Sequence, residues 1–305
     1  MKKQHKQPKH INAKRNNKKL CENHFDDNHK NEYIIEVNNL NKTFEKKIKG
    51  KGKGIKGFFN PTIETFNAVN DISFNIKKGE KVAFVGPNGA GKSTTIKMLT
   101  GIIHPTSGEV KVAGYNPIKQ RKQMAYKIGC MFGQKSGLWM HLSAMDSFKL
   151  FAAIYDIDEK IAIERINHLV ETFKIQDLIN IPVRKLSLGQ RMICEIVAVL
   201  IHEPEIIFLD EPTIGLDIVV KERVRNLIKA INEKKNVTVF LTSHDVGDIE
   251  KLCDRVIIID QGRLVIDEDI KTLKEKYMKT EMITVKKEES VALEDIIYDI
   301  YTHKS

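Results

Sequence analysis

One glycine-rich segment has the residue types and the spacing that bind a phosphate chain: Gly86-Pro87-Asn88-Gly89-Ala90-Gly91-Lys92-Ser93-Thr94. It follows an apolar run, residues 81–85, and a helix-forming segment begins near Lys92. Glycine lets the backbone curl so that successive N–H groups face one anion, and the positive end of the helix dipole adds to the same point. In such a loop Lys92 reaches the β- and γ-phosphates, and the Ser93 hydroxyl holds Mg²⁺. A glycine turn before an ordinary helix is the alternative, which the flanking strand and helix disfavour.

Two carboxylates end a second apolar strand, residues 206–209. Asp210 stands at the carboxyl end of that strand, where an open α/β sheet places ligand groups, and it would hold Mg²⁺ largely through water. Glu211 follows on the loop, where it could orient or deprotonate a water that faces the γ-phosphate. Together with the upstream glycine-rich loop, the pair predicts a hydrolytic site rather than a strand that merely ends in a polar loop.

Two further segments could complete a phosphate site. His244 follows a third apolar strand, and a neutral imidazole there can donate to a γ-phosphate oxygen or to the attacking water. Residues 186–191 open a predicted helix, residues 190–202, which Ser187 can cap, and the Gly189 backbone can approach an anion closely. A histidine beside a helix start and an ordinary helix cap are the plainer interpretations of these two segments.

Strands and helices must alternate to bring these residues together. Strands are predicted over residues 33–37, 72–76, 81–85, 110–112, 128–132, 206–209, 237–241, 256–259 and 263–267. Helices are predicted over residues 118–126, 190–202, 218–232 and 245–252. A helical block from about 143 to 180, with apolar residues at spacings of three and four, interrupts the alternation. The pattern predicts an α/β fold with a largely parallel sheet covered by helices, and a separate helical lobe.

The net charge of +10 is concentrated in two segments of the 305-residue chain. Residues 1–31 hold nine Lys and Arg against three Asp and Glu, are poor in apolar residues, and are expected to be disordered. Residues 45–60 hold six Lys against one Glu, and residues 45–65 are predicted to form an inserted loop or hairpin tip. Flexible, solvated lysine explains both segments better than lipid or RNA binding, so no specific nucleic-acid partner is expected.

The remaining composition indicates a cytoplasmic protein. No apolar run approaches the ~20 residues that cross a bilayer, and the N-terminus lacks the apolar core of a secretory signal. The four cysteines have no paired spacing, which is typical of reduced thiols in a cytosolic protein.

The ordered set of motifs resembles the ATPase subunit of an ATP-binding cassette (ABC) transporter. The resemblance spans about residues 33–270 and rests on the glycine-rich loop, Gln134, residues 186–190, Asp210, Glu211, residues 215–217 and His244. The lysine- and glycine-containing insertion and the segments 132–139 and 186–192 are most similar to ABC-2-type exporter ATPases, of the sort often labelled drug or viologen exporters.

This resemblance implies an architecture and a domain plan. The architecture is a P-loop NTPase core with a mostly parallel sheet, an antiparallel β subdomain and an inserted helical lobe. The ABC ATPase domain would occupy residues 32–270, with its helical signalling lobe at about 138–190. The basic tail, residues 1–31, would precede it, and a C-terminal extension, residues 271–305, would follow.

The resemblance also implies roles for single residues. The catalytic set is Glu211 as the base, His244 as the switch histidine, Lys92 of Walker A and Gln134 of the Q-loop, which signals to the membrane partner. Mg²⁺ would be held by Ser93, Gln134 and the Walker B residue Asp210. Asp217 is the D-loop residue, and Ser187 and Gly189 are signature residues that contact the γ-phosphate of the opposite subunit. Adenine would stack on Phe44, with Phe66 as the alternative because the insertion makes the register ambiguous.

One residue departs from the family pattern: Leu188 stands where the signature usually has glycine. Its side chain must then point away from the nucleotide, or the contact is weakened. Because Gln134, Glu211 and His244 are intact, a hydrolysing subunit is expected rather than a degenerate one.

The implied function is an ATP-binding and hydrolysing subunit that powers an ABC-2-type exporter. Two subunits, expected to be identical copies, would sandwich ATP and Mg²⁺ at the cytoplasmic face of the cell membrane and move a separate multi-spanning permease subunit. The alternative is a soluble ABC ATPase that acts on ribosomes or nucleic acid. Proteins of that kind resemble two cassettes in one chain, whereas this chain has one P-loop.

Overall fold

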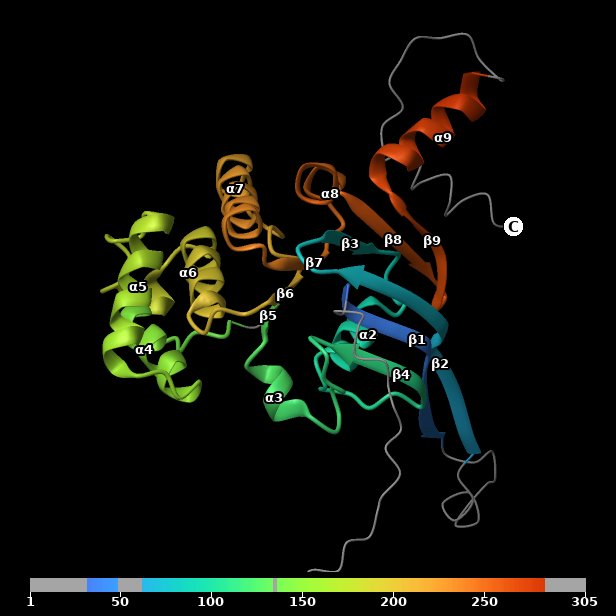
Figure 1. The fold of residues 1–305 in the computed structure, drawn as a ribbon, viewed down its shortest axis with the longest axis horizontal. Helices are drawn as coiled ribbons and strands as arrows, with labels where there is room; N and C mark the ends of the chain where they lie inside the picture. Colours follow the sequence, from blue (N-terminus) through green and yellow to red (C-terminus); the bar gives the residue numbers. More distant parts are fainter. Residues whose placement is uncertain (1–31, 49–61, 134–135, 283–305) are drawn as a thin grey trace, which may run out of the picture. The chain divides into compact units, whose positions relative to one another are not determined.

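The computed structural model describes residues 32–48, 62–133 and 136–282. Their main element is a six-stranded sheet with the order β5-β6-β7-β3-β8-β9, parallel except for β9, which pairs antiparallel with β8 (Figure 1). Its strands are β3 (Lys81–Val85), β5 (Ile128–Phe132), β6 (Ile206–Asp210), β7 (Thr238–Thr242), β8 (Arg255–Asp260) and β9 (Arg263–Asp269). Because β3, β6 and β7 run in parallel, the residues that follow their carboxyl ends gather at one edge.

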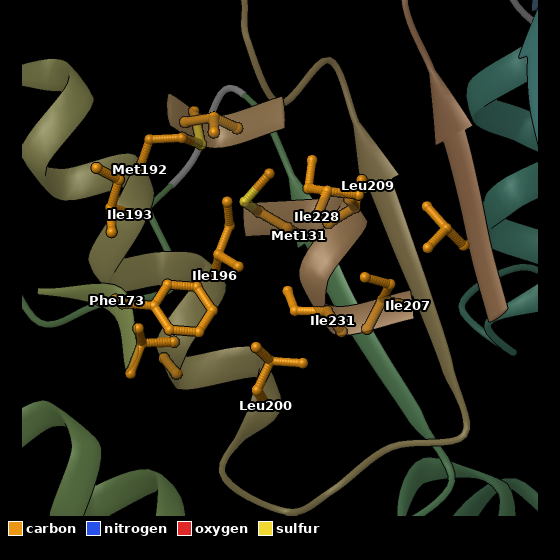
Figure 2. Close-up of a cluster of buried hydrophobic side chains, with 14 of the residues drawn as sticks. Met131, Phe173, Met192, Ile193, Ile196, Leu200, Ile207, Leu209, Ile228 and Ile231 are labelled. Carbon is orange, nitrogen blue, oxygen red and sulfur yellow. The ribbon is translucent and has the colours of Figure 1, made fainter. Parts of the chain in front are cut away.

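The central strands are mostly apolar because both faces of this sheet are covered. Alternate residues of a strand point to opposite faces, so Ile206 and Phe208 of β6 join one buried cluster, and Ile207 and Leu209 join another. Figure 2 shows part of the second cluster, in which Ile207 and Leu209 face side chains of the helices that cover that side. This continuous burial holds the strand ends in fixed relative positions.

A smaller antiparallel sheet covers the first face. It has the order β2-β1-β4 and consists of β1 (Tyr33–Ile48), β2 (Thr62–Lys77) and β4 (Ser107–Val112). Helix α2 (Lys92–Leu99) packs with it, because Ile96, Met98 and Leu99 share one buried cluster with residues of β1 and β2. The short helix α3 (Arg121–Ala125) precedes β5. The predicted antiparallel β subdomain is thus confirmed.

Three helices form the helical lobe: α4 (Ala144–Ile154), α5 (Glu159–Phe173) and α6 (Leu188–Leu200). The 3₁₀ turn η1 (Val183–Lys185) leads into α6, and α6 also contacts β5 and α7. Helices α7 (Ile218–Lys235) and α8 (Val246–Leu252) pack on the same face of the sheet, and α9 (Ile270–Met282) follows β9. Within the described residues, no helix combines the length and the apolar composition that would span a membrane.

Several elements differ from their predicted bounds. Strands β1 and β2 were predicted to be short, but they pair as far as Ile48 and Thr62, so the arms of the basic insertion form a hairpin. The rest of the insertion, residues 49–61, lies outside the described part, as does the basic tail. Strand pairing uses backbone hydrogen bonds, which polar residues form as well as apolar ones. Hydrophobic alternation alone therefore predicts strands of this kind too short.

The starts of helices α6 and α9 also differ from the predictions. Helix α6 begins at Leu188 rather than 190, because Ser187 and Gln190 form a capping box. Helix α9 was not predicted, and its first turns belong to the packed body: Leu273 is buried, and the Ile270 N–H donates to the Asp254 carbonyl at 2.9 Å. The predicted C-terminal extension therefore begins inside a packed helix.

Candidate nucleotide site

The glycine-rich loop between β3 and α2 takes its shape from contacts that only glycine permits. Gly91 precedes α2 with φ of 106°, and a Cβ there would lie 2.4 Å from the Ala68 carbonyl oxygen. A Cβ on Gly86 would lie 2.3 Å from the Ile259 carbonyl oxygen. Gly89 also has a positive φ, 83°, at the open tip of the loop. Larger residues would force the loop away from its neighbours.

The turn between β8 and β9 supports this loop from outside. The Gly262 N–H donates to the Ala90 carbonyl at 3.0 Å, and the Asn70 N–H donates to the Gly262 carbonyl at 2.7 Å. Inside the loop, the Ala90 N–H donates to the Pro87 carbonyl at 3.1 Å, which leaves Asn88 and Gly89 exposed at the tip. These hydrogen bonds hold the loop backbone in one shape, which is the preorganisation that phosphate binding needs.

The start of α2 is suited to an anion. No side chain caps its first N–H groups, and Lys92, Ser93 and Thr94 form its first turn. The Lys92 ammonium donates to the carbonyls of Gly86 at 2.5 Å and Pro87 at 3.1 Å, so it lies over the loop. Burial lowers its pKa, and the nearby carboxylates of Glu211 and Asp210 oppose that shift. Unpaired N–H groups, a helix dipole and an ammonium group together form a phosphate site.

Asp210 ends β6 beside the glycine-rich loop. The Thr242 hydroxyl donates to its Oδ1 at 2.5 Å, which fixes the carboxylate and leaves Oδ2 for another ligand. Ser93 presents an exposed hydroxyl at the start of α2. Mg²⁺ in nucleotide sites is held by one or two protein oxygens together with substrate phosphates and waters, so this donor set fits it. Gln134, the third predicted ligand, lies outside the described residues.

Glu211 and His244 face each other across the ends of β6 and β7. The His244 N–H donates to Glu211 Oε2 at 3.3 Å, and the imidazole Nε2 lies 3.4 Å from Oε1. Among the described residues, Glu211 Oε1 is a buried oxygen with no hydrogen-bond partner. Burial raises the pKa of Glu211, Asp210 raises it further, and the interactions with His244 and Lys92 oppose the rise. A carboxylate that has a raised pKa and an oxygen free of hydrogen bonds is suited to accept a proton from water.

The backbone of Glu211 is held in an unusual conformation. Its φ is 55°, in the left-handed region that a non-glycine residue adopts only at a cost of about 1–3 kcal/mol. The Glu211 N–H donates to the Thr242 carbonyl at 3.1 Å and contacts the Thr242 hydroxyl at 3.2 Å, which compensates for that cost. The neighbouring strand therefore sets the direction of the Glu211 side chain.

A buried network behind these loops was not anticipated from the sequence. Asp248 is fully buried and accepts hydrogen bonds from the hydroxyls of Thr213 and Ser243 and, at 2.6 Å, from the Arg225 guanidinium. Burial tends to lower the pKa of Arg225, but the bonds and charges of its acidic partners, Asp248 foremost, outweigh burial and raise it. Thr213 lies two residues after Glu211, and Ser243 directly precedes His244. The network therefore fixes both loops.

The signature segment lies at a different place in the same chain. Ser187 accepts the Gln190 N–H at 3.2 Å as the helix cap, and its own O–H donates to no group in the described part of the chain. Gly189 is buried, and a Cβ there would lie 2.4 Å from Val220 Cγ1, so this glycine permits the packing of α6 on α7. The Leu188 side chain lies beside Gly215, in the loop that leads to the exposed Asp217.

These signature residues are not brought to the glycine-rich loop of their own chain. Among the described residues, no hydrogen bond or ion pair joins the signature segment or Asp217 to residues 86–94. Asp217 caps α7 by accepting the Val220 N–H at 2.9 Å. The structure therefore assembles Lys92, Ser93, Asp210, Glu211 and His244 in one place, and no hydrogen bond or ion pair of the described residues links the signature residues to this group.

Phe44 and Phe66 are direct cross-strand partners in the β1–β2 hairpin. Residues opposite each other on paired strands share one face, so the two candidates for the adenine contact lie side by side. Their side chains are 40% and 61% exposed, and the Lys42 ammonium lies 4.9 Å from the centre of the Phe44 ring. The Ala68 carbonyl, on the same strand as Phe66, lies close to Gly91 of the glycine-rich loop. Phe66 is therefore only two residues along β2 from a contact with that loop.

Comparison with known proteins decides the family. The profile of the "ABC transporter" family matches residues 69–214. The bacitracin transport ATP-binding protein BcrA of Bacillus licheniformis is 34% identical over 244 residues, which cover 78% of this chain and 76% of BcrA. The chain belongs to the ABC transporter family. The ABC transporter ATP-binding protein NatA of Bacillus subtilis is 35% identical to this ABC subunit over 65% of the chain and 80% of NatA.

Solved structures agree with this assignment. The structure of cbiO1 from Clostridium perfringens, part of the ABC transporter complex cbiONQ, is 27% identical with a TM-score of 0.67 and covers 83% of this chain and 94% of cbiO1. A dimeric post-hydrolysis structure of the ATP-binding cassette MJ0796, bound to ADP and Pi, is 26% identical with a TM-score of 0.65 and covers 78% of this chain and 99% of that one. The predicted ABC ATPase fold and ATPase activity are confirmed.

Proposed function

We propose that this ABC ATPase hydrolyses ATP to drive an ABC-2-type exporter. The observation that carries the proposal is the buried Oε1 of Glu211, which accepts no hydrogen bond from the described residues and lies 3.4 Å from His244 Nε2, beside the glycine-rich loop. The relatives named for transport, among them the bacitracin transport protein BcrA, favour an exporter over a ribosomal or nucleic-acid role. The substrate would be selected by the membrane partner.

Each residue of the assembled site has a chemical task in this proposal. Residues 86–94 bind the phosphate chain through backbone N–H groups, and Lys92 neutralises the β- and γ-phosphates. Ser93 and Asp210 would hold Mg²⁺, with Gln134 as a further predicted ligand, and the ion would supply charge neutralisation on the phosphates. Glu211 accepts a proton from the attacking water, and His244 orients that water or donates to the γ-phosphate.

A second copy of the chain would complete each site. The exposed Ser187 hydroxyl accepts one bond and retains its proton, so it can donate to the γ-phosphate of ATP bound to another subunit. The separation of Ser187 from the glycine-rich loop within one chain supports this arrangement. The dimeric form of the MJ0796 cassette is consistent with it.

Adenine stacks on Phe44 in this proposal, with Phe66 as the outer half of a two-ring platform. Replacing Phe44 with alanine is expected to weaken ATP binding by about 1–3 kcal/mol, the usual range for loss of stacking on a base. Phe66→Ala is expected to have the smaller effect because its ring is the more exposed. Titration with a fluorescent ATP analogue, and with the triphosphate alone as the control, measures both effects. A Phe66→Ala loss larger than that of Phe44→Ala would reverse the assignment.

The membrane partner is proposed to contact the helical lobe. Five large apolar side chains are exposed at its start and along α4: Trp139, Met140, Leu142, Leu150 and Ile154. Trp139 packs edge-on against Phe151 of α4, with ring centres 5.4 Å apart, so this patch has a defined shape. Exposed large apolar side chains that gather on one element are typical of a protein–protein contact, and such a contact would hold the subunit at the cytoplasmic face of the membrane.

Affinity purification from detergent-solubilised membranes tests the partner. We expect a multi-spanning protein to co-purify in stoichiometric amount, as identified by mass spectrometry. Ile154→Asp should reduce that recovery several-fold, because a charge would replace a 55% exposed apolar side chain. Ile163→Asp, the same change at an exposed position of α5, is the matched control. Recovery with ribosomes, or only in the soluble fraction, would contradict the proposal.

A further inference from the structure

A cleft lies between α5, α7 and the turn after α6. Its volume is about 550 Å³, within the range of small-molecule sites. Its floor consists of apolar side chains: Leu169, Phe173, Leu200, Leu227, Ile231 and Val237. We call it the α5–α7 cleft. It is remote from the nucleotide site, because its residues Glu205 and Val237 precede β6 and β7, whereas Asp210 and Thr242 end those strands.

The floor of the α5–α7 cleft is both apolar and recessed. Phe173 of α5, Leu200 of α6 and Ile231 of α7 come from three different helices and converge there (Figure 2). All three side chains are buried, so the cleft reaches down to the hydrophobic core rather than crossing an open surface. A flat partner such as a bilayer surface cannot reach such a floor, whereas a narrow apolar chain can.

The rim of the cleft carries excess positive charge. Its two carboxylates are each bound by two cations: Glu205 by Lys78 at 3.3 Å and Lys127 at 2.8 Å, and Glu203 by Arg165 at 2.7 Å and Lys235 at 3.4 Å. These cations neutralise both acids, and among the residues that line the cleft itself, Lys78, Lys234 and Lys235 outnumber Glu203 and Glu205 by one.

Two further basic groups lie on the rim. Lys234 and His168 both line the cleft, and neither forms a hydrogen bond or ion pair with any residue that the structure describes. Lys234 lies in the last turn of α7. The rim therefore offers an anion an ammonium group that has no acidic partner in the described part of the chain, in a cleft with an apolar floor.

We propose that the α5–α7 cleft binds a small anionic amphiphile, namely a free long-chain carboxylate, with its chain on the apolar floor and its carboxylate at Lys234. Charge complementarity selects the head group, and burial of the chain supplies most of the affinity. The site goes beyond the proposed transport function and does not depend on it. Because the cleft joins α5 of the helical lobe to α7 of the sheet-covering layer, its ligand would be shared by both parts.

The full-length protein can be titrated with cis-parinaric acid, a fluorescent long-chain carboxylate, without nucleotide. We expect saturable binding at one site that Lys234→Glu weakens roughly tenfold or more, a change equivalent to about 1.4 kcal/mol. Lys229→Glu, which makes the same charge change on α7 outside the cleft lining, should bind as the wild type does. Ala230→Trp, which fills the cleft and keeps its charges, should abolish binding. Thermal unfolding verifies that each variant is folded.

Four outcomes would overturn the proposal. They are no saturable binding by the wild type, equal affinity for Lys234→Glu, equal affinity for the methyl ester of the probe, and binding only to phosphatidylglycerol vesicles, which would indicate a membrane source. Saturating ATP should not displace the probe, because the two sites lie at opposite ends of the strands. Glu211→Gln should bind the probe normally, so a failure of the ATPase proposal is separable from a failure of this one.

Discussion

Replacing Glu211 with glutamine is expected to lower the rate of ATP hydrolysis by about 10²- to 10⁴-fold, the usual cost of removing a general base. Glutamine has nearly the same shape as glutamate, so the backbone bonds of residue 211 to Thr242 and the left-handed turn should remain. Lys92 and the glycine-rich loop are unchanged, so ATP should still bind. In the proposed mechanism, ATP that is bound but not hydrolysed holds two subunits together.

The experiment combines steady-state phosphate release with size-exclusion chromatography in ATP and Mg²⁺. The variant should accumulate as a dimer in ATP and return to monomer in ADP, whereas the wild type should show little dimer at steady state. Glu164→Gln, the same change at an exposed position of α5, serves as a control outside the assembled site. Normal turnover by Glu211→Gln would remove this residue from the chemistry.

The acid limb of the pH–rate profile should depend on the same residue. Burial raises the pKa of Glu211, and only the carboxylate form can accept a proton. Hydrolysis should therefore fall, as the pH is lowered, at a higher pH than an ordinary glutamate would produce.

The sequence predicts the sheet and its phosphate loop because both carry local signals. Apolar strands such as residues 81–85 and 206–209 must be buried on both faces, and glycines next to Lys92 have few other uses. The structure brings Lys92, Ser93, Asp210, Glu211 and His244 together, as the order of strands and loops predicts. The predicted fold class and ATPase family are confirmed.

Other features depend on pairings that no local pattern reveals. Phe44 and Phe66 are brought opposite each other by hairpin pairing across the insertion. This register could not be predicted from the sequence. Gly189 is a signature residue by resemblance, yet its missing side chain also makes room for Val220, more than thirty positions away. The role of Leu188 likewise depends on its contact with Gly215. Signals of this kind arise only when distant segments pack together.

The Asp248 network is the clearest case of such a missed feature. In the sequence, Asp248, Arg225 and Thr213 are polar residues of the kind expected at the surface. No neighbouring pattern indicates that they are buried. In the structure Asp248 is 0% exposed, Arg225 Nε donates to its Oδ1 at 2.6 Å, and a terminal guanidinium nitrogen lies 2.6 Å from the same oxygen. A buried charge that loses its partner is costly, and the network holds the loops that carry Glu211 and His244.

Asp248→Ala is therefore expected to lower the free energy of unfolding by about 3–5 kcal/mol, the range for breaking a buried ion pair. Urea titration followed by circular dichroism measures this loss. Lys251→Ala, which breaks the exposed ion pair with Glu222, is the control and should cost at most about 1 kcal/mol.

The double variant Arg225→Met, Asp248→Leu distinguishes the effect of the two charges from the effect of the volume that their side chains fill. Removing both charges leaves no unpaired ion, so this variant should be more stable than Asp248→Ala. It should nevertheless hydrolyse ATP more slowly than the wild type, because Thr213 and Ser243 lose the acceptor that fixes the loops of Glu211 and His244. If Asp248→Ala were no less stable than Lys251→Ala, the network would have no structural role. If the double variant hydrolysed ATP at the wild-type rate, the network would contribute stability without positioning the catalytic loops.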